Sequence, residues 1–549
     1  MTQNMIKNPI LPGFYPDPSI CRVGDDFYMV CSSFELYPGI PVFHSRDLAH
    51  WDQLCYAMTK ENGFHVEANV VAGGVMAPTI RYHEGTFYII NANFCDKGNY
   101  IVTAKDPAGP WSQPYWLDDV PGIDASLFFD DDGRAYVIGT GNVVARADGT
   151  MDRGIYICEF DIKTMRTVGK PITIWDSALR VATSPEAPHI YKVGDYYYLV
   201  IAEGGTEHYH AVTVARSKDL MGWYEGNPAN PVMTHRQFGF SYPIDNVGHA
   251  DLIDTPDGHW YAVMLGSRII GGQHKNLGRE TYLCPVIWER EWPVFSPDSG
   301  KIDWEYPADT ALPWTPAAPK APLDHFDCAP LDLDWSLWGT PYCDFYTIEN
   351  SHLSLKCLGR TMSDPFQPLF KSTLNKDPEN TVSFVGRRQT GIDFDAFCRM
   401  DFTPAEGESA GLVILQASNH QYRLERTMDH GRQLLKLLLI HADFEVPPHV
   451  PGFTYDMHTE VLAAVDCPET NLILGLRAAG QSYDFYYGPN GDPDGLTCLY
   501  KNADGRRINP EIVGGMVGTL VGVFATANHN SSPSENSAAF DWFYYKNQD

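Results

Sequence analysis

Five segments of the chain repeat one pattern, and this repeat limits the fold more than any other feature of the sequence. In each segment a short apolar stretch leads into a turn with a glycine, and the next stretch is rich in aromatic residues. The spacings are 61, 48, 61 and 64 residues between the turn glycines Gly24, Gly85, Gly133, Gly194 and Gly258. Glycine supplies the positive φ that a tight turn requires, and the flanking residues favour strands. Each segment therefore predicts a β-hairpin.

The number and the spacing of these hairpins together favour an all-β fold, a five-bladed β-propeller. The spacing is longer than a common four-stranded blade and leaves room for one blade and a loop. Helical periodicity is almost absent between the hairpins. A β-sandwich built from repeated hairpins is the alternative, and the repeat alone leaves it open.

The residues that open the five repeats carry an unusual concentration of charge. The first strand of each propeller blade lines the central channel, so the opening residues should converge on one funnel. They are Asp17, Ala77 or Pro78, Asp124, Glu186 and His249. Taken singly, Asp17 could cap a turn, Asp124 could bond to nearby backbone, and His249 could be a core histidine. Three carboxylates and a histidine at equivalent positions of apolar strands would be costly to bury without a purpose, which favours a functional site.

Such a trio of carboxylates suits the hydrolysis of a glycosidic bond. One carboxylic acid must protonate the departing oxygen, and one carboxylate must activate water or attack the sugar. The acid needs a raised pKa, which burial and a neighbouring negative charge both provide. Glu186, with the longer side chain, suits the acid, and Asp17, held by Pro18, suits the base. Asp124 then supplies the neighbouring charge.

The composition of the chain changes after residue 300, where prolines become frequent. Pro307, Pro313, Pro316, Pro319 and Pro322 interrupt regular structure, which predicts a linker over residues 301–322. Beyond it, alternating stretches at 353–357, 411–415 and 540–545 predict a second all-β domain, most simply a sandwich. The expected division is a propeller over 1–300, the linker, and a sandwich over 323–549.

Composition excludes several classes of protein. A formal net charge of -29 disfavours nucleic-acid and anionic-membrane partners, and no apolar run is long enough to span a bilayer. No signal peptide is visible, and the twelve cysteines form no C-x-x-C pair, so we expect reduced thiols in a cytoplasmic protein. The run at 130–133, DDDG, begins like a calcium loop but lacks the later ligands, so a hairpin turn is the favoured interpretation.

Ordered motifs through the first 300 residues resemble glycoside hydrolase family 43. They are NPILPGFYPDPS at 8–19, FHSRDL at 43–48, GIDASLFFDDDG at 122–133, IAEGGT at 201–206, GHAD at 248–251 and LGRE at 277–280. FVGRRQ at 384–389 and FDWF at 540–543 resemble the C-terminal concanavalin-like (jelly-roll) sandwich of its two-domain members. The resemblance implies a five-bladed propeller and an inverting mechanism, with Asp17 as general base, Asp124 as the residue that tunes and orients the acid, and Glu186 as general acid.

The resemblance also implies substrate contacts. Phe34 would pack on the terminal sugar, Arg279 would bond its hydroxyls, Thr206 would contribute more weakly, and His249 would lie at the pocket floor. No cofactor is required, although some members hold a calcium ion or water near the residue that corresponds to His249.

Three departures from the family pattern concern the pocket and the acid. Met76 stands where xylosidase-type members often have an aromatic residue, and Met516 stands where the sandwich often gives a phenylalanine. Met fills irregular space, so we expect an adaptable pocket wall, unless a nearby aromatic residue does the stacking. The acid lies in SPEAPH rather than the more usual EGPH.

The expected activity is exo-acting release of terminal β-D-xylose, α-L-arabinofuranose or both from xylan- or arabinoxylan-derived oligosaccharides. An endo-arabinanase is an alternative enzyme, although a docked second domain argues against its open groove. A non-catalytic sugar-binding propeller is an alternative of another class, but it would not need three carboxylates. The sequence leaves the oligomeric state open, a homo-oligomer included.

Overall fold

A computed structural model describes residues 3–67, 74–147, 149–177, 183–364, 376–446, 454–489, 495–513, 517–529 and 534–548. Strands dominate these residues. The helical elements whose bounds lie within these residues are short: α1 (Pro510–Val513) and the 3-10 turns η1 (Lys60–Asn62), η2 (Arg236–Phe238), η3 (Pro378–Asn380) and η5 (Gly505–Arg507). None of the helices described here has the length and apolar character needed to cross a membrane.

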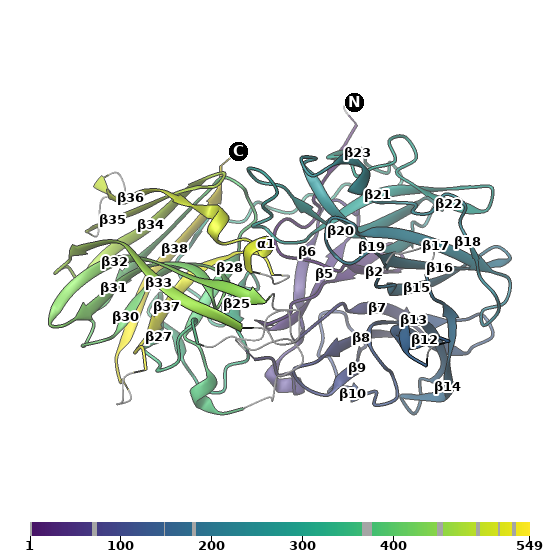
Figure 1. Cartoon of the computed structure of the whole chain (residues 1–549), viewed down its shortest axis with the longest axis horizontal. Helices are drawn as coiled ribbons and strands as arrows, with labels where there is room; N and C mark the ends of the chain where they lie inside the picture. The colour runs from purple at the N-terminus through teal and green to yellow at the C-terminus, as the bar shows by residue number, and fades with distance from the viewer. Residues whose placement is uncertain are drawn as a thin grey trace.

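The N-terminal part is a ring of five four-stranded antiparallel sheets, so the predicted five-bladed propeller is confirmed (Figure 1). The first blade consists of β2 (Ser19–Val23), β3 (Asp26–Val30), β5 (Gly39–Ser45) and β6 (Asp52–Met58). The second consists of β7 (Thr79–His83), β8 (Thr86–Asn93), β9 (Gly98–Ala104) and β10 (Tyr115–Trp116). The third consists of β11 (Ile123–Phe129), β12 (Ala135–Ala145), β13 (Met151–Asp161) and β14 (Arg166–Trp175). The fourth consists of β15 (Glu186–Val193), β16 (Tyr196–Glu203), β17 (Ala211–Ser217) and β18 (Glu225–Gly226). The fifth consists of β19 (Ile244–Asp254), β20 (Trp260–Arg268), β21 (Glu280–Glu289) and β22 (Trp292–Phe295).

The repeated hairpins are the two innermost strands of each blade. The five turn glycines have φ between 59° and 88°, as the turn argument requires. The innermost strands β2, β7, β11, β15 and β19 contact their neighbours around the ring, and β19 contacts β2 to close it. The DDDG run is a hairpin turn, in which Gly133 donates to the Asp130 carbonyl at 3.0 Å.

The predicted linker runs along the propeller and contains one strand that the prolines did not suggest. β23 (Glu305–Pro307) pairs with β1 (Met5–Lys7), because its proline is the last residue of the strand and interrupts no pairing within it. Nearby, the Asn8 side chain donates to the carbonyls of Leu283 and Asp303 at 2.8 and 2.9 Å. The two ends of the propeller are thus joined by backbone pairing.

The C-terminal part is the predicted sandwich of two antiparallel sheets. One sheet contains β24 (Leu323–Asp324), β26 (Tyr346–Glu349), β27 (His352–Lys356), β29 (Phe394–Asp401), β34 (Asn471–Ala479), β35 (Ser482–Pro489), β36 (Thr497–Asp504) and β38 (Ser537–Asn547). The other contains β25 (Trp335–Trp338), β28 (Phe384–Arg388), β30 (Ser409–Ala417), β31 (His420–Asp429), β32 (Arg432–Val446), β33 (Thr454–Asp466), β37 (Leu520–Thr526) and a strand from the propeller, β4 (Leu36–Tyr37).

The two parts share a buried apolar cluster. Phe14, Phe34 and Leu36 of the propeller segment pack with Trp338 and Phe384 of the sandwich. Polar contacts surround this cluster, including Arg388 Nε to the Phe14 carbonyl at 2.8 Å. At another contact a Cβ on Gly278 would meet Gly518 Cα at 2.7 Å, so only glycine allows this approach. The sandwich is therefore packed tightly against one face of the propeller.

Candidate active site

The residues that open the inner strands share an irregular backbone. Asp17, Asp124 and His249 have φ of 55°, 53° and 55°, a left-handed conformation that is uncommon for residues other than glycine. Strand pairing is shifted next to Asp124, Glu186 and His249. A bulge at the same point of several blades re-aims side chains, and such strain gathers at functional sites. These four residues all lie at one end of the ring, which we call the site face.

Asp17 is a buried carboxylate held by three polar neighbours. Its Oδ1 accepts from Arg279 Nη1 at 2.8 Å and lies 3.5 Å from His249 Nδ1, while its Oδ2 accepts from Ser32 Oγ at 2.5 Å. Burial alone would raise the pKa of Asp17, but Arg279, His249 and Ser32 outweigh it and hold this pKa below its ordinary value. Asp17 is consequently ionised near neutral pH.

Asp124 and Glu186 show the opposite tendency. Burial raises the pKa of Asp124 well above its ordinary value, and the charges of Glu186 and Asp17 raise it further. Burial also raises the pKa of Glu186, with Asp17 adding to the rise and Arg153 opposing it. Because the two carboxyl groups interact, they titrate as a pair that retains a proton more readily than isolated carboxyls do. The three carboxyl groups thus lie close enough to influence one another.

Hydrogen bonds between blades fix the backbone around Glu186. Ser126 Oγ donates to the Pro188 carbonyl at 2.5 Å, and Thr140 Oγ1 donates to the Pro185 carbonyl at 2.5 Å. Both donors come from the third blade, which also carries Asp124. The position of Glu186 relative to Asp124 is therefore set by direct contacts between neighbouring blades.

Arg279 links several of the predicted substrate contacts. Its Nη1 donates to Thr206 Oγ1 at 3.1 Å as well as to Asp17, and its guanidinium lies 5.3 Å from the centre of the Phe34 ring. Its Nε and Nη2 are buried and have no partner among the described residues. These unpaired donors of Arg279, beside a carboxylate, suit the binding of hydroxyl groups.

Burial lowers the pKa of His249, so this histidine is neutral near pH 7.

Phe34 lies beside Arg279, and Met76 follows Val75, the residue that pairs with Phe34. Phe34 is buried, with its ring centre 5.8 Å from that of Phe14, and its backbone pairs with Val75. Met76 is also buried, and its carbonyl accepts from Asn91 Nδ2 at 2.7 Å. Met516 lies outside the described residues. The structure gathers Asp17, Asp124, Glu186, Phe34, Thr206, His249 and Arg279, and it places Met76 next to Val75, the strand partner of Phe34; their catalytic and binding roles stay predictions.

Sequence reasoning did not single out Arg153, whose Nη1 donates to Glu186 Oε1. Arg153 lies on β13, outside the repeated hairpins, so the repeat carried no signal for it.

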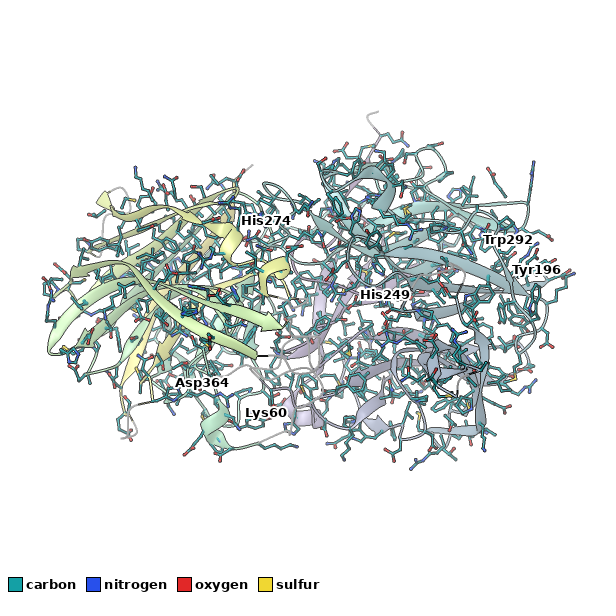
Figure 2. All side chains as sticks on the ribbon, viewed as in Figure 1. Lys60, Tyr196, His249, His274, Trp292 and Asp364 are labelled. Carbon is teal, nitrogen blue, oxygen red and sulfur yellow. The ribbon has the colours of Figure 1, made fainter. Side chains whose placement is uncertain are left out.

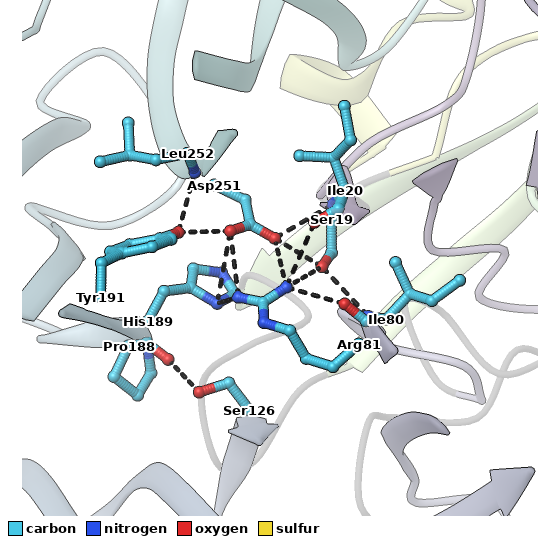
Figure 3. Close-up of polar contacts among 10 residues, drawn as sticks. All are labelled: Ser19, Ile20, Ile80, Arg81, Ser126, Pro188, His189, Tyr191, Asp251 and Leu252. Atoms are coloured by element: carbon cyan, nitrogen blue, oxygen red, sulfur yellow. Dashed lines mark hydrogen bonds and ion pairs between the residues drawn. The ribbon is translucent and has the colours of Figure 1, made fainter. Parts of the chain in front are cut away.

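A further ion pair, between Arg81 of β7 and Asp251 of β19, joins innermost strands of the propeller (Figure 3). Arg81 Nη1 and Nη2 donate to Asp251 at 2.8 and 3.1 Å, and Nη2 lies 3.0 Å from His189 Nδ1. Asp251 also accepts from Ser19 Oγ at 2.6 Å and from the Tyr191 hydroxyl. The network joins four of the five innermost strands. The sequence does contain a sign of this network. Arg81 is the one charged residue at a position of the repeat that Cys21, Phe128, Ile190 and Ile253 occupy in the other four hairpins.

The residues around His249 do not fit a calcium ion. Calcium prefers several carboxylate and carbonyl oxygens. The carboxylates nearest His249 are Asp17, which pairs with Arg279, and Asp251, which pairs with Arg81. The described residues contain two groups with metal-like donor spacing, Asp257–His259–Asp309 and Glu406–Asp429–His430, and neither includes His249. Figure 2 marks His249 well inside the propeller.

Comparison with known proteins identifies the family. The model of glycosyl hydrolases family 43 matches residues 6–293, and that of the β-xylosidase C-terminal concanavalin A-like domain matches residues 323–546. The chain belongs to glycosyl hydrolase family 43. Its Glu186, Asp17 and Asp124 all fall inside the matched propeller region.

Relatives within family 43 align over almost the whole chain. A xylosidase/arabinosidase of Butyrivibrio fibrisolvens is 40% identical over 98% of this chain and 98% of its own. The non-reducing end α-L-arabinofuranosidase BoGH43B of Bacteroides ovatus is 35% identical over 100% of this chain and 96% of its own. The solved structure of a xylan β-1,4-xylosidase from Bacillus halodurans C-125 has a TM-score of 0.85 at 29% identity and covers 98% of this chain and 100% of its own. The two-domain architecture is therefore that of the family.

Proposed function

We propose that this family 43 protein is an exo-acting, inverting glycosidase that removes terminal β-D-xylose, α-L-arabinofuranose or both from xylan- or arabinoxylan-derived oligosaccharides. The observation that carries the proposal is that the pKa values of the three carboxyl groups are shifted in opposite directions. The pKa of Asp17 is held low, whereas the pKa values of Asp124 and Glu186 are raised by burial. Acid–base hydrolysis requires a base whose pKa is low enough that it is ionised and an acid whose pKa is high enough that it keeps its proton.

In the proposed reaction, protonated Glu186 gives its proton to the glycosidic oxygen as the bond from that oxygen to the anomeric carbon breaks. A water molecule attacks the opposite side of the anomeric carbon and transfers a proton to ionised Asp17. Asp124, coupled to Glu186, favours the protonated state of the acid. Arg279 and His249 hold Asp17 in place, and the free Nε and Nη2 of Arg279 are available to the sugar hydroxyls.

Exo-action is supported by the position of the sandwich. The segment that carries Arg279 also carries Asn276, whose side chain donates to the carbonyls of Gly505 and Ile508 at 2.8 Å each. The sandwich thus contacts a loop of the site face, and a second domain at this position supports a site that accepts chain ends rather than the middle of a long chain. Both sugars are kept in the proposal because relatives named for each of them align over nearly the whole chain.

We also propose that the reaction needs no metal ion and takes place in the cytoplasm. The two carboxylates near His249 are each paired with an arginine, Asp17 with Arg279 and Asp251 with Arg81. The twelve cysteines, all of them among the described residues, form no disulfide, which suits a reducing compartment. Activity should therefore survive dialysis against EDTA, and the protein should be recovered in the cytoplasmic fraction of its cells.

A panel of substrates tests the proposed activity. Aryl β-D-xyloside, aryl α-L-arabinofuranoside, xylo-oligosaccharides and arabinoxylan fragments are incubated with the enzyme, and the first-formed anomer is read by NMR. Single pentoses of inverted configuration are expected. Retained configuration would contradict the mechanism, and arabinan cut into oligomers would identify an endo-arabinanase.

Two variants test the roles of the carboxyl groups. Asp17→Ala and Glu186→Ala should each lower kcat/KM by about 10²–10⁴-fold. The Glu186→Ala loss should be smaller for a good aryl leaving group, which needs little protonation, whereas the Asp17→Ala loss should not depend on the leaving group. Circular dichroism checks that the fold persists, and near-normal release of nitrophenol by either variant would refute its assigned role.

A further inference from the structure

Three aromatic side chains, His208, Tyr209 and Phe240, cluster at the rim of the site face, and two of them, Tyr209 and Phe240, are exposed while the His208 side chain is mostly buried. The rings of His208 and Phe240 lie 4.1 Å apart between centres, and those of His208 and Tyr209 lie 5.3 Å apart. Tyr209 is 63% exposed and Phe240 is 51% exposed. We call these three residues the rim aromatic cluster. None of them takes part in the proposed chemistry.

The position of the cluster follows from strand register. Glu186 pairs with Ala202, so β16 ends at the site face and the loop after Glu203 begins there. That loop carries Thr206, which bonds to Arg279, and three residues later Tyr209. Phe240 lies just before β19, whose first residue Ile244 is also at the site face, because β19 runs from there through His249. The cluster is therefore attached to the same loop and strand as the candidate active site.

Local contacts hold the cluster in one arrangement. Gly204 has φ of 90°, and a Cβ there would meet the Tyr209 carbonyl oxygen at 2.2 Å, so the loop turns tightly. His208 Nδ1 lies 3.1 Å from Asp245 Oδ1, and Asp245 Oδ2 lies 3.2 Å from Lys275 Nζ. Lys275 Nζ also lies 3.3 Å from Glu511 of α1 in the sandwich. A chain of polar contacts, His208 to Asp245 to Lys275 to Glu511, thus fixes His208, on which Phe240 packs.

Two exposed rings that both pack against one fixed residue, His208, favour a binding surface over two unrelated exposed side chains. Contiguous exposed apolar surface marks interaction sites, whereas single exposed rings are ordinary. An aromatic ring offers a flat apolar face, which suits the C–H face of a sugar ring while the sugar hydroxyls stay in water. The net charge of -29 favours a neutral ligand over an anionic one.

We propose that the rim aromatic cluster binds the sugar units on the leaving-group side of the scissile bond. This inference rests on the proposed function, because it names the part of the substrate that lies beyond the terminal pentose. The cluster would make the enzyme prefer oligosaccharides of three or more units, since the added units bind to rings that an aryl glycoside does not reach. It places part of the substrate specificity in the loop between β16 and β17.

The test compares substrates of different length in matched variants. Tyr209→Ala, Phe240→Ala and the double variant are assayed with an aryl pentoside, with xylobiose and xylotriose, and with arabinotriose. The ratio of kcat/KM for the trisaccharide to kcat/KM for the aryl glycoside should fall roughly 5- to 10-fold in the double variant. Trp223→Ala is the control, because Trp223 is 82% exposed but lies after β17, at the opposite face of the ring, and its ratio should equal that of the wild type.

Binding of the same trisaccharides, measured by isothermal titration calorimetry with Glu186→Ala added to each protein so that the ligand is not hydrolysed, separates this inference from the proposed function. In this background, weaker binding by the Tyr209→Ala/Phe240→Ala double variant than by the protein with both rings supports the cluster even if no glycoside is hydrolysed by the active enzyme. An unchanged ratio together with unchanged binding would overturn the inference. Equal losses on the aryl glycoside and the trisaccharide would also overturn it, since the rings would then serve the structure of the site.

Discussion

Individual residues of the site are arranged by backbone strain as much as by side-chain contacts. Asp17, Asp124 and His249 hold left-handed φ values that cost of order 1–3 kcal/mol each. The network around Asp17 and the bonds between the third and fourth blades compensate for this cost. The same local distortion in different blades points the side chains at one another, which a regular strand would not do.

Arg153 allows the pKa of the proposed acid to be tested directly. This arginine opposes the rise in the pKa of Glu186, so Arg153→Gln should raise that pKa further. Because the acid must be protonated, the alkaline limb of the pH profile of kcat/KM should move to higher pH. The acid limb, set by Asp17, should stay where it is. A profile unchanged at its alkaline side would show that Glu186 is not the group that titrates there.

The repeat made four of these residues predictable, whereas their supporting residues were not. Asp17, Asp124, Glu186 and His249 occupy one repeat position, so aligning the five repeats with one another is enough to group them. Arg153 and Thr206 lie outside the repeat, and their contacts join residues 33 and 73 positions apart. Phe34, Thr206 and Arg279 came only from the family resemblance, and Arg153 came from neither the repeat nor the resemblance.

At the scale of secondary structure, the hairpins of the blades can be predicted from the sequence, whereas the short strands that pair distant segments cannot. Each hairpin has its own glycine turn and alternating residues, which are local signals. β4 spans two residues, Leu36 and Tyr37, too few to show a period, and its partner β25 lies about 300 residues away. Likewise, β23 ends in a proline and lies within the proline-rich stretch that predicts a linker, so its sequence does not indicate a strand.

The ion pair between Arg81 of β7 and Asp251 of β19 should be a major contributor to the stability of the ring. Arg81→Met leaves the Asp251 carboxylate buried and unpaired, which costs about 3–5 kcal/mol. The midpoint of thermal unfolding should therefore fall, and the double variant Arg81→Met/Asp251→Asn should recover part of the loss. Arg134→Met, which breaks an exposed pair with Asp132, serves as the control and should change little. Equal midpoints for the Arg81 and Arg134 variants would contradict this account.

For the whole molecule, the contact between propeller and sandwich contains a titratable group. Glu35 is buried beside Phe34, its backbone carbonyl accepts from Gly339 of the sandwich at 3.0 Å, and its Oε2 has no partner among the described residues. Burial raises the pKa of Glu35 to about 8. The carboxyl group is therefore neutral in the folded protein at pH 7 and ionised in the unfolded chain.

This group should make the protein less stable as pH rises. Between about pH 4.5 and 8 the folded state binds the proton and the unfolded state does not, so the free energy of unfolding falls by about 1.4 kcal/mol per pH unit. Glu35→Gln removes this dependence, and its thermal midpoint should exceed that of the wild type by more at pH 8 than at pH 5. Glu349→Gln, at an exposed position, is the control. The same difference at both pH values would be inconsistent with the raised pKa.

The short strand β4 means that one sheet of the sandwich is completed by a strand from the propeller segment. A C-terminal fragment made alone would present β25 as an open sheet border, ready to pair with any extended peptide. In the whole protein, the propeller segment that contains β4 covers this edge by pairing with β25. Separating the two halves would thus yield a self-associating fragment rather than a freestanding module.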